Sequence, residues 1–169
     1  MKRFTPAWLA VCLACSFSTS SLAADALATR AFQGMPADFI KGADISTLLD
    51  AEKHGATFYD QNNQRKDPIA ILKENGVNYV RLRLWADPQS ASSEDYGGGN
   101  NDLATTLALA KRAKAQGMKL LLDFHYSDFW TDPGKQFKPK AWEKMGYPQL
   151  KTAIHDYTRD TIARLKQAG

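Results

Sequence analysis

The stretch VNYVRLRLW at residues 77–85 decides the fold. With the two-residue period of a strand, one of its faces is wholly apolar, formed by Val80, Leu82 and Leu84. The opposite face carries two arginines between aromatic residues: Tyr79, Arg81, Arg83 and Trp85. In an open doubly wound sheet helices cover both faces, so both should be apolar. The arginines therefore favour a barrel, whose inward face meets the active site at the carboxyl ends of the strands. An edge strand with solvated arginines is the alternative.

Two further segments repeat this signal. Residues 118–124 alternate between an apolar face and a face that carries Asp123 and, just past the strand, His125. Residues 39–44 form a shorter apolar stretch that ends in Asp44. Three successive strands are thus predicted to deliver polar side chains to the same end of a sheet, where a functional site would lie.

Helical patterns separate the strands. Asp67-Pro68 starts a helix that Gly76 ends, because Asp caps a helix and Pro suits its first position. Residues 102–116 form the next helix, and apolar residues spaced from Leu150 to Leu165 predict a last one. Ser46 is a candidate cap for a short helix that runs to His54. This alternation predicts a parallel sheet with right-handed crossovers.

Length limits how much of a barrel is present. The chain has 169 residues, whereas a (β/α)8 TIM barrel takes about 250. The predicted fold is therefore α/β, with the first three or so βα units of a TIM barrel that is incomplete in this chain; a small open α/β domain is the alternative. Residues 73–76 and 114–117 each close a helix before a strand, and residues 166–169 repeat this pattern. We therefore expect a fourth strand to follow Gly169.

The N-terminus has the pattern of a secretory signal peptide. A basic start at residues 1–3 precedes an apolar run over 4–17 and the small-x-small triplet at 21–23. We predict a signal peptide at 1–23, then a leader at 24–36. The apolar run is shorter than the ~20 residues that span a membrane, so we expect a secreted or periplasmic protein with no stable membrane anchor.

Charge and cysteine content exclude other classes of function. A net charge of +4 is too small to argue for nucleic acid as a partner. Both cysteines, Cys12 and Cys15, lie in the predicted signal peptide, so the exported chain has neither a disulfide nor a thiol nucleophile. The three histidines lack metal-ligand spacing, and we expect neither a metal site nor a cofactor.

Aromatic residues follow the same strands as the polar ones. They are Trp85, Tyr126, Phe129 and Trp130, with Trp142 further on. Sugar rings offer apolar C–H faces to aromatic planes and hydroxyl groups to Asp, Arg and His. This combination favours a carbohydrate site, and ordinary packing is the alternative for each tryptophan.

These residues carry a resemblance to glycoside hydrolase family 53, the endo-β-1,4-galactanases. Residues 39–46, 79–85 and 98–100 resemble that family, and the strongest likeness is LDFHYSDFWTDP at 122–133. The resemblance covers about residues 36 to 169. It implies that residues 37–169 are the N-terminal part of a (β/α)8 catalytic domain, which cleaves pectic galactan with retention of configuration.

The same resemblance implies that the catalytic residues lie elsewhere. In this family the acid/base is a Glu after the fourth strand and the nucleophile is a Glu after the seventh, and neither strand is present here. The exported sequence has four glutamates, and none of them follows a fourth strand: Glu52, Glu74, Glu94 and Glu143. We therefore expect no catalytic residue in this chain, and no activity from the chain alone.

Supporting residues can be carried over one by one. Arg83 resembles the arginine that stands beside the nucleophile, and its position nearer the strand end favours it over Arg81. Substrate-binding roles are implied for five further residues: Asp44, Trp85, Asp123, His125 and Trp130. Calcium occurs in some members of the family, but no ligand cluster is visible in this sequence.

The implied partner is plant cell-wall galactan or arabinogalactan, bound by a protein that we expect to be monomeric when full length. Two alternatives remain. One is another retaining barrel glycosidase that acts on a different β-glycan. The other is a non-catalytic carbohydrate-binding α/β module.

Overall fold

The computed structural model describes residues 33–88 and 99–169. The chain divides into two units, Met1–Ala37 and Asp38–Gly169, and all the described helices and strands belong to the second. The predicted signal peptide at 1–23 and most of the predicted leader at 24–36 lie outside the described residues, as does Glu94.

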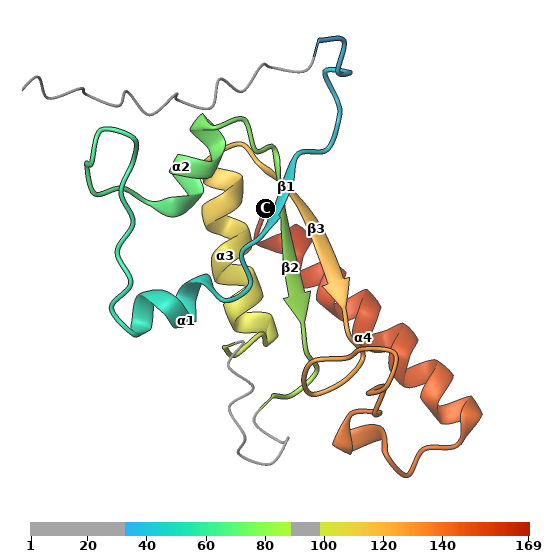
Figure 1. The fold of residues 1–169 in the computed structure, drawn as a ribbon. Helices are drawn as coiled ribbons and strands as arrows, with labels where there is room; N and C mark the ends of the chain where they lie inside the picture. The colour runs from blue at the N-terminus through green and yellow to red at the C-terminus, as the bar shows by residue number, and fades with distance from the viewer. Residues whose placement is uncertain (1–32, 89–98) are drawn as a thin grey trace, which may run out of the picture. The chain divides into compact units, whose positions relative to one another are not determined.

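Three parallel strands form the sheet, in the order β1 (Gly42–Asp44), β2 (Tyr79–Leu84) and β3 (Lys119–Phe124) (Figure 1). Asp44 lies opposite Arg81, and Arg83 lies opposite Asp123. The three predicted strands are thus confirmed. The first is shorter than the apolar stretch predicted for it, because the residues before Gly42 are about half exposed and make no ladder.

The helices follow the predicted alternation. They are α1 (Leu48–Lys53), α2 (Pro68–Glu74), α3 (Leu103–Ala115), the 3-10 turn η1 (Lys140–Trp142) and α4 (Tyr147–Gln167). Two predicted starts are confirmed by their capping bonds. Asp67 accepts the N–H of Ile69 at 2.8 Å, and Asp102 accepts that of Thr105 at 2.8 Å. Each cap satisfies an amide that has no partner inside its helix.

The predicted cap at Ser46 is wrong. The N-cap of α1 is Thr47, whose side chain makes no capping hydrogen bond. The hydroxyl of Ser46 instead accepts the backbone N–H of Arg83 on β2, at 2.9 Å. The ladder of β1 ends at Asp44, so the buried amide of Arg83 needs another acceptor, and a buried amide without one is costly.

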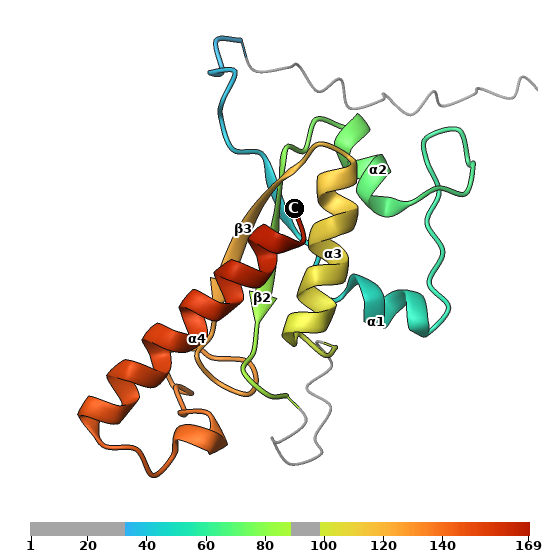
Figure 2. The same ribbon diagram turned by 180° about the vertical axis from the view of Figure 1, so that it is seen from behind.

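The apolar face of β2 is buried under the helices. Val80, Leu82 and Leu84 are each at most 1% exposed, as the period of two predicts. Figure 2 shows α3 and α4 running across this face of the sheet. Burial of each such side chain stabilises the fold by roughly 1.5–3 kcal/mol. The opposite face of the sheet has no helix over it among the described residues (Figure 1), and Leu121 there is 44% exposed.

One arginine holds three helices together. Arg112 on α3 binds Glu52 of α1 through two hydrogen bonds of 2.8 and 2.9 Å, and lies 3.2 Å from the carboxylate of Asp67, which caps α2. The hydrogen bonds to Glu52 raise the pKa of Arg112, and Asp67 adds to this effect. Glu52 is therefore committed to structure, like Glu74, which pairs with Lys66 at 2.5 Å.

The sheet face that no described helix covers, called the open face below, leads us to expect that the chain folds poorly by itself. Among the described residues β3 pairs with β2 on one side alone, and an open strand edge pairs readily with other chains. We expect a polypeptide limited to this chain to aggregate or to unfold without cooperativity. Urea unfolding of a monomeric fraction from size exclusion would measure this. A single transition with an m-value suited to its size would contradict the expectation and favour a stand-alone binding module.

Candidate active site

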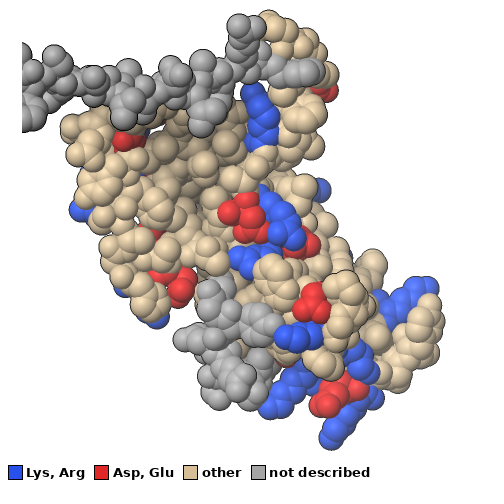
Figure 3. Space-filling model, viewed as in Figure 1, with Lys and Arg blue, Asp and Glu red and all other residues tan. Residues whose placement is uncertain are grey.

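Charged side chains gather on the open face of the sheet. They come from all three strands, and Figure 3 shows basic and acidic side chains lying side by side over the middle of this face. The set consists of two arginines of β2 with one carboxylate from each flanking strand: Arg81, Arg83, Asp44 and Asp123. The parity of β2 predicted the arginines, and the register of the sheet brings the carboxylates to them.

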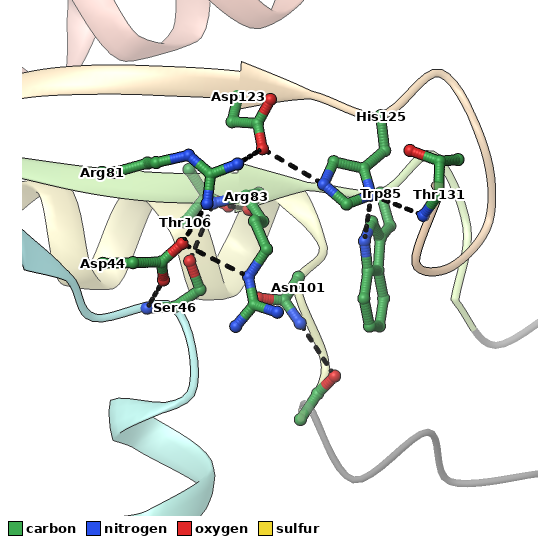
Figure 4. A network of polar contacts seen from close by, with 11 residues as sticks. Asp44, Ser46, Arg81, Arg83, Trp85, Asn101, Thr106, Asp123, His125 and Thr131 are labelled. Atoms are coloured by element: carbon green, nitrogen blue, oxygen red, sulfur yellow. Dashed lines mark hydrogen bonds and ion pairs between the residues drawn. The ribbon is translucent and has the colours of Figure 1, made fainter. Parts of the chain in front are cut away.

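Arg81 bridges the two carboxylates. Its Nη1 donates to Asp44 at 2.5 Å, and its Nη2 donates to Asp123. Figure 4 shows the guanidinium of Arg81 lying between the two acids. The positive charge of Arg81 is therefore balanced by two carboxylates of the sheet itself.

Hydrogen bonds keep Asp44 ionised. Burial by itself would raise its pKa, but the hydrogen bonds from Ser46, the charge of Arg83 and the hydrogen bond from Arg81 together outweigh burial. The pKa of Asp44 is thus lowered below its ordinary value. One of these bonds is the backbone N–H of Ser46 donating to Oδ1 of Asp44 at 2.9 Å. Ser46 is therefore a site residue that the sequence interpretation missed.

His125 is held by three partners that fix its tautomer. The indole N–H of Trp85 and the backbone N–H of Thr131 both donate to Nδ1, each at 3.1 Å. Nδ1 therefore carries no proton, and this pattern assigns the proton to Nε2, which donates to Asp123 at 3.2 Å. The side chain of His125 is only 6% exposed. Trp85, His125 and Asp123 are therefore brought together as one hydrogen-bonded chain (Figure 4).

Arg83 is placed differently from Arg81. Its side chain is 9% exposed, and its guanidinium carbon lies 4.9 Å from the centre of the Trp130 ring, within the range of a cation–π contact. Nε of Arg83 is buried without a hydrogen-bond acceptor among the described residues, and it lies 3.6 Å from the Asp44 carboxylate. Trp130 also meets the ring of His125 edge-on, with 5.7 Å between centroids. The described structure therefore leaves hydrogen-bonding capacity on Arg83 unused.

A hollow of about 450 Å³ lies beside His125 and is lined by residues of the loop that follows β3. Phe137 in its wall is 60% exposed. Trp142 does not appear among the residues that line this hollow; it packs edge-on against Tyr157 of α4, with 5.6 Å between the ring centroids.

No group of three or more metal-ligating side chains occurs among residues 33–88 and 99–169. No helix in those ranges is long and apolar enough to cross a membrane.

Parallel βα units with polar and aromatic side chains gathered at the carboxyl ends of the strands are typical of an enzyme built on a (β/α)8 barrel. Comparison with known proteins agrees. The chain belongs to glycosyl hydrolase family 53, whose model matches residues 40–169.

Two relatives and one solved structure agree with this family assignment. The chain is 45% identical over 150 residues to the endo-beta-1,4-galactanase of Bacillus subtilis (strain 168), covering 89% of this chain and 35% of that protein. It is 45% identical over 130 residues to the arabinogalactan endo-beta-1,4-galactanase of Cellvibrio japonicus, covering 76% of this chain and 32% of that protein. The catalytic domain of the Ignisphaera aggregans GH53 protein superimposes with a TM-score of 0.76 at 45% identity, over 80% of this chain and 38% of that domain.

The chain thus spans about a third of the length of the curated relatives that it matches. The three βα units are a part of the α/β barrel fold, as predicted. The experiments below use the full-length protein, by which we mean a polypeptide that contains this chain and the rest of the catalytic domain.

The lowered pKa of Asp44 has a consequence for stability. A carboxyl whose pKa is lower in the folded than in the unfolded state stabilises the fold at pH values above its unfolded pKa of about 3.9. That contribution disappears as the pH falls through the folded pKa. We expect Asp44→Asn to lower the free energy of unfolding of the full-length protein at pH 7, and the difference from wild type to shrink below about pH 4.

Urea unfolding at a series of pH values from 7 to 2.5 measures this difference. In an Arg81→Gln background, which removes one partner of Asp44, the pH-dependent part is expected to be smaller. A difference between wild type and Asp44→Asn that stays constant over the whole series would contradict the expectation.

Proposed function

We propose that the chain is the N-terminal part of an exported, retaining endo-β-1,4-galactanase and that it supplies the substrate-side wall of the active site. The observation that carries the proposal is Arg83, a buried guanidinium with unused hydrogen-bonding capacity, set between Trp130 and Asp44. The galactanase names of the relatives support the choice of substrate.

In this proposal Arg83 acts on the nucleophile. A fixed positive charge beside a glutamate favours its ionised form, which a retaining glycosidase needs for attack on the sugar. Arg81 is a poor candidate for this task because Asp44 and Asp123 already share its charge. The acid/base is the glutamate that follows the family's fourth strand and the nucleophile is the one that follows its seventh, and neither strand is among the three strands here.

The remaining residues divide into two groups. Trp130 is proposed to contact the sugar, because an aromatic plane suits the C–H face of a galactose ring. His125, for which the resemblance implies substrate binding, has both ring nitrogens engaged by Trp85, Thr131 and Asp123, so we propose that it supports the site without a hydrogen bond to the sugar. Trp85 is 3% exposed and donates its indole N–H to His125, which favours a supporting role. Asp44 and Asp123 are proposed to hold Arg81 and the two rings in place while they line the subsites.

Export is part of the proposal. The signal peptide at 1–23 rests on the sequence pattern alone, as do the leader at 24–36 and the start of the catalytic domain near residue 37. A secreted or periplasmic enzyme would meet plant galactan outside the cytoplasm. N-terminal sequencing of the exported protein tests the cleavage site.

The deciding experiment assays the full-length protein on polysaccharides. β-1,4-galactan is expected to yield short galacto-oligosaccharides with retained configuration, followed by proton NMR of the first products. β-glucan and β-mannan serve as matched substrates, and preferential cleavage of either would favour the alternative of a glycosidase for another β-glycan. Galactan binding without any cleavage would favour the non-catalytic module.

A further inference from the structure

Asp128 joins two segments at the base of the loop that follows β3. Its Oδ1 accepts the backbone N–H of Asp87, just after β2, at 3.0 Å. Its Oδ2 accepts the backbone N–H of Lys140, the first residue of η1, at 2.8 Å. The residue is only 4% exposed. Each carboxylate oxygen thus satisfies a different amide.

The neighbouring backbone strengthens this junction. The N–H of Ala86 donates to the carbonyl of Ser127 at 2.8 Å, so the segments that leave β2 and β3 run side by side, as Figures 1 and 2 both show. Tyr126 turns the chain into the junction with a φ of 49°, a conformation that is uncommon outside glycine. Its hydroxyl is hydrogen-bonded to Thr158 of α4 at 2.9 Å, which anchors the turn.

Trp130 lies on the loop that this junction closes. The bond from Lys140 to Asp128 closes the segment 128–140, and Trp130 is two residues from its start. The adjacent N–H of Thr131 donates to His125. A shift of the loop base would therefore move the Trp130 ring relative to both Arg83 and His125.

We propose that Asp128 is a positioning residue that holds Trp130 against Arg83 and His125. Asp128 acts through the loop base, where it binds the amides of Asp87 and Lys140. The effect on substrate rests on the proposed function, because it assumes that Trp130 stacks on galactose. The placement of the Trp130 ring does not depend on that assumption.

The sharpest change is Asp128→Asn, which keeps the shape of the side chain and one acceptor oxygen. The amide NH2 then faces an N–H group, so either Asp87 or Lys140 loses its acceptor. In the full-length protein we expect KM for β-1,4-galactan to rise about fivefold or more, with a smaller change in kcat, because the altered ring position weakens stacking before chemistry. Asp102→Asn is the matched control, since Asn caps a helix as well as Asp does; its KM should stay at the wild-type value.

A double-mutant cycle with Trp130→Ala separates positioning from general stability. If Asp128 acts through Trp130, Asp128→Asn adds little to the KM of the Trp130→Ala variant. A KM that rises by the full factor in that background would overturn the proposal, as would a wild-type KM for Asp128→Asn alone.

A spectroscopic measurement tests the placement of the Trp130 ring without relying on enzymatic activity. The full-length protein is labelled with 5-fluorotryptophan, and the 19F signal of Trp130 is assigned by its loss in Trp130→Phe. Asp128→Asn is expected to shift or broaden this signal, whereas Asp102→Asn leaves it in place. An unchanged Trp130 signal overturns the placement even if galactan proves to be the wrong substrate. A shifted signal in a protein without galactanase activity supports the placement and contradicts only the proposed function.

Discussion

The isolated chain is expected to release no reducing sugar from β-1,4-galactan. A retaining glycosidase needs two carboxyl groups about 5–5.5 Å apart, one protonated and one ionised, on either side of the glycosidic bond. The two carboxylates of the open face, Asp44 and Asp123, both bind Arg81 and cannot take these roles. Of the described glutamates, Glu52 and Glu74 are paired on the helices. Binding groups alone cannot form and hydrolyse a covalent glycosyl intermediate.

The measurement is a reducing-sugar assay of the purified chain after removal of the predicted signal peptide, beside a mock purification from the same host. The same residues joined to the matching C-terminal remainder of the Bacillus subtilis relative provide a positive control. Activity of the isolated chain above the mock level would show that its own carboxylates perform the chemistry.

Arg83→Ala is expected to lower kcat of the full-length protein on the order of 10²-fold or more, by analogy with the loss of other preorganised electrostatic groups. That factor corresponds to about 2.7 kcal/mol of transition-state stabilisation. The guanidinium is buried, and although it lies 3.6 Å from Asp44, its Nε lacks a hydrogen-bond acceptor among the described residues, so it can still bind a further carboxylate. KM should change much less than kcat, because the charge matters most as the nucleophile attacks.

Arg112→Ala is the matched control for Arg83→Ala. Its loss breaks the contacts with Glu52 and Asp67 among the helices, away from the open face, so it should lower stability while kcat of the folded protein stays near wild type. Steady-state kinetics and urea unfolding of both variants separate the two effects. A near-normal kcat for Arg83→Ala would assign a purely structural role to Arg83, or would move the electrostatic role to Arg81.

Local patterns predicted the fold well. The alternation in β2 placed Val80, Leu82 and Leu84 in the core because the side-chain period of a strand depends only on its backbone. The cap at Asp67 was equally predictable, since its partner amide lies two residues away, and a helix start was predicted at Asp102 without its capping role. In each of these cases the interacting groups are close in sequence, or the buried face follows from the two-residue period of a single strand.

Contacts between distant segments were not predictable in the same way. Ser46 has a good local reason to cap a helix, but its hydroxyl binds an amide 37 residues away. Asp128 appeared in the sequence only as part of a family-like motif, because its partners lie 41 and 12 residues away. The bridging of Asp44 and Asp123 by Arg81 likewise depends on the strand register, which no single strand encodes.

The bridge at Arg81 also bears on how this family can change over evolutionary time. One guanidinium serves carboxylates on two different strands, so replacing it with a neutral residue would leave Asp123 without an arginine partner and Asp44 with Arg83 alone, 3.6 Å away. Replacing either acid alone would leave a surplus positive charge beside Arg83. Drift at these three positions is therefore expected to be concerted, with compensating substitutions on neighbouring strands, while the loops that follow the strands are free to diversify one at a time.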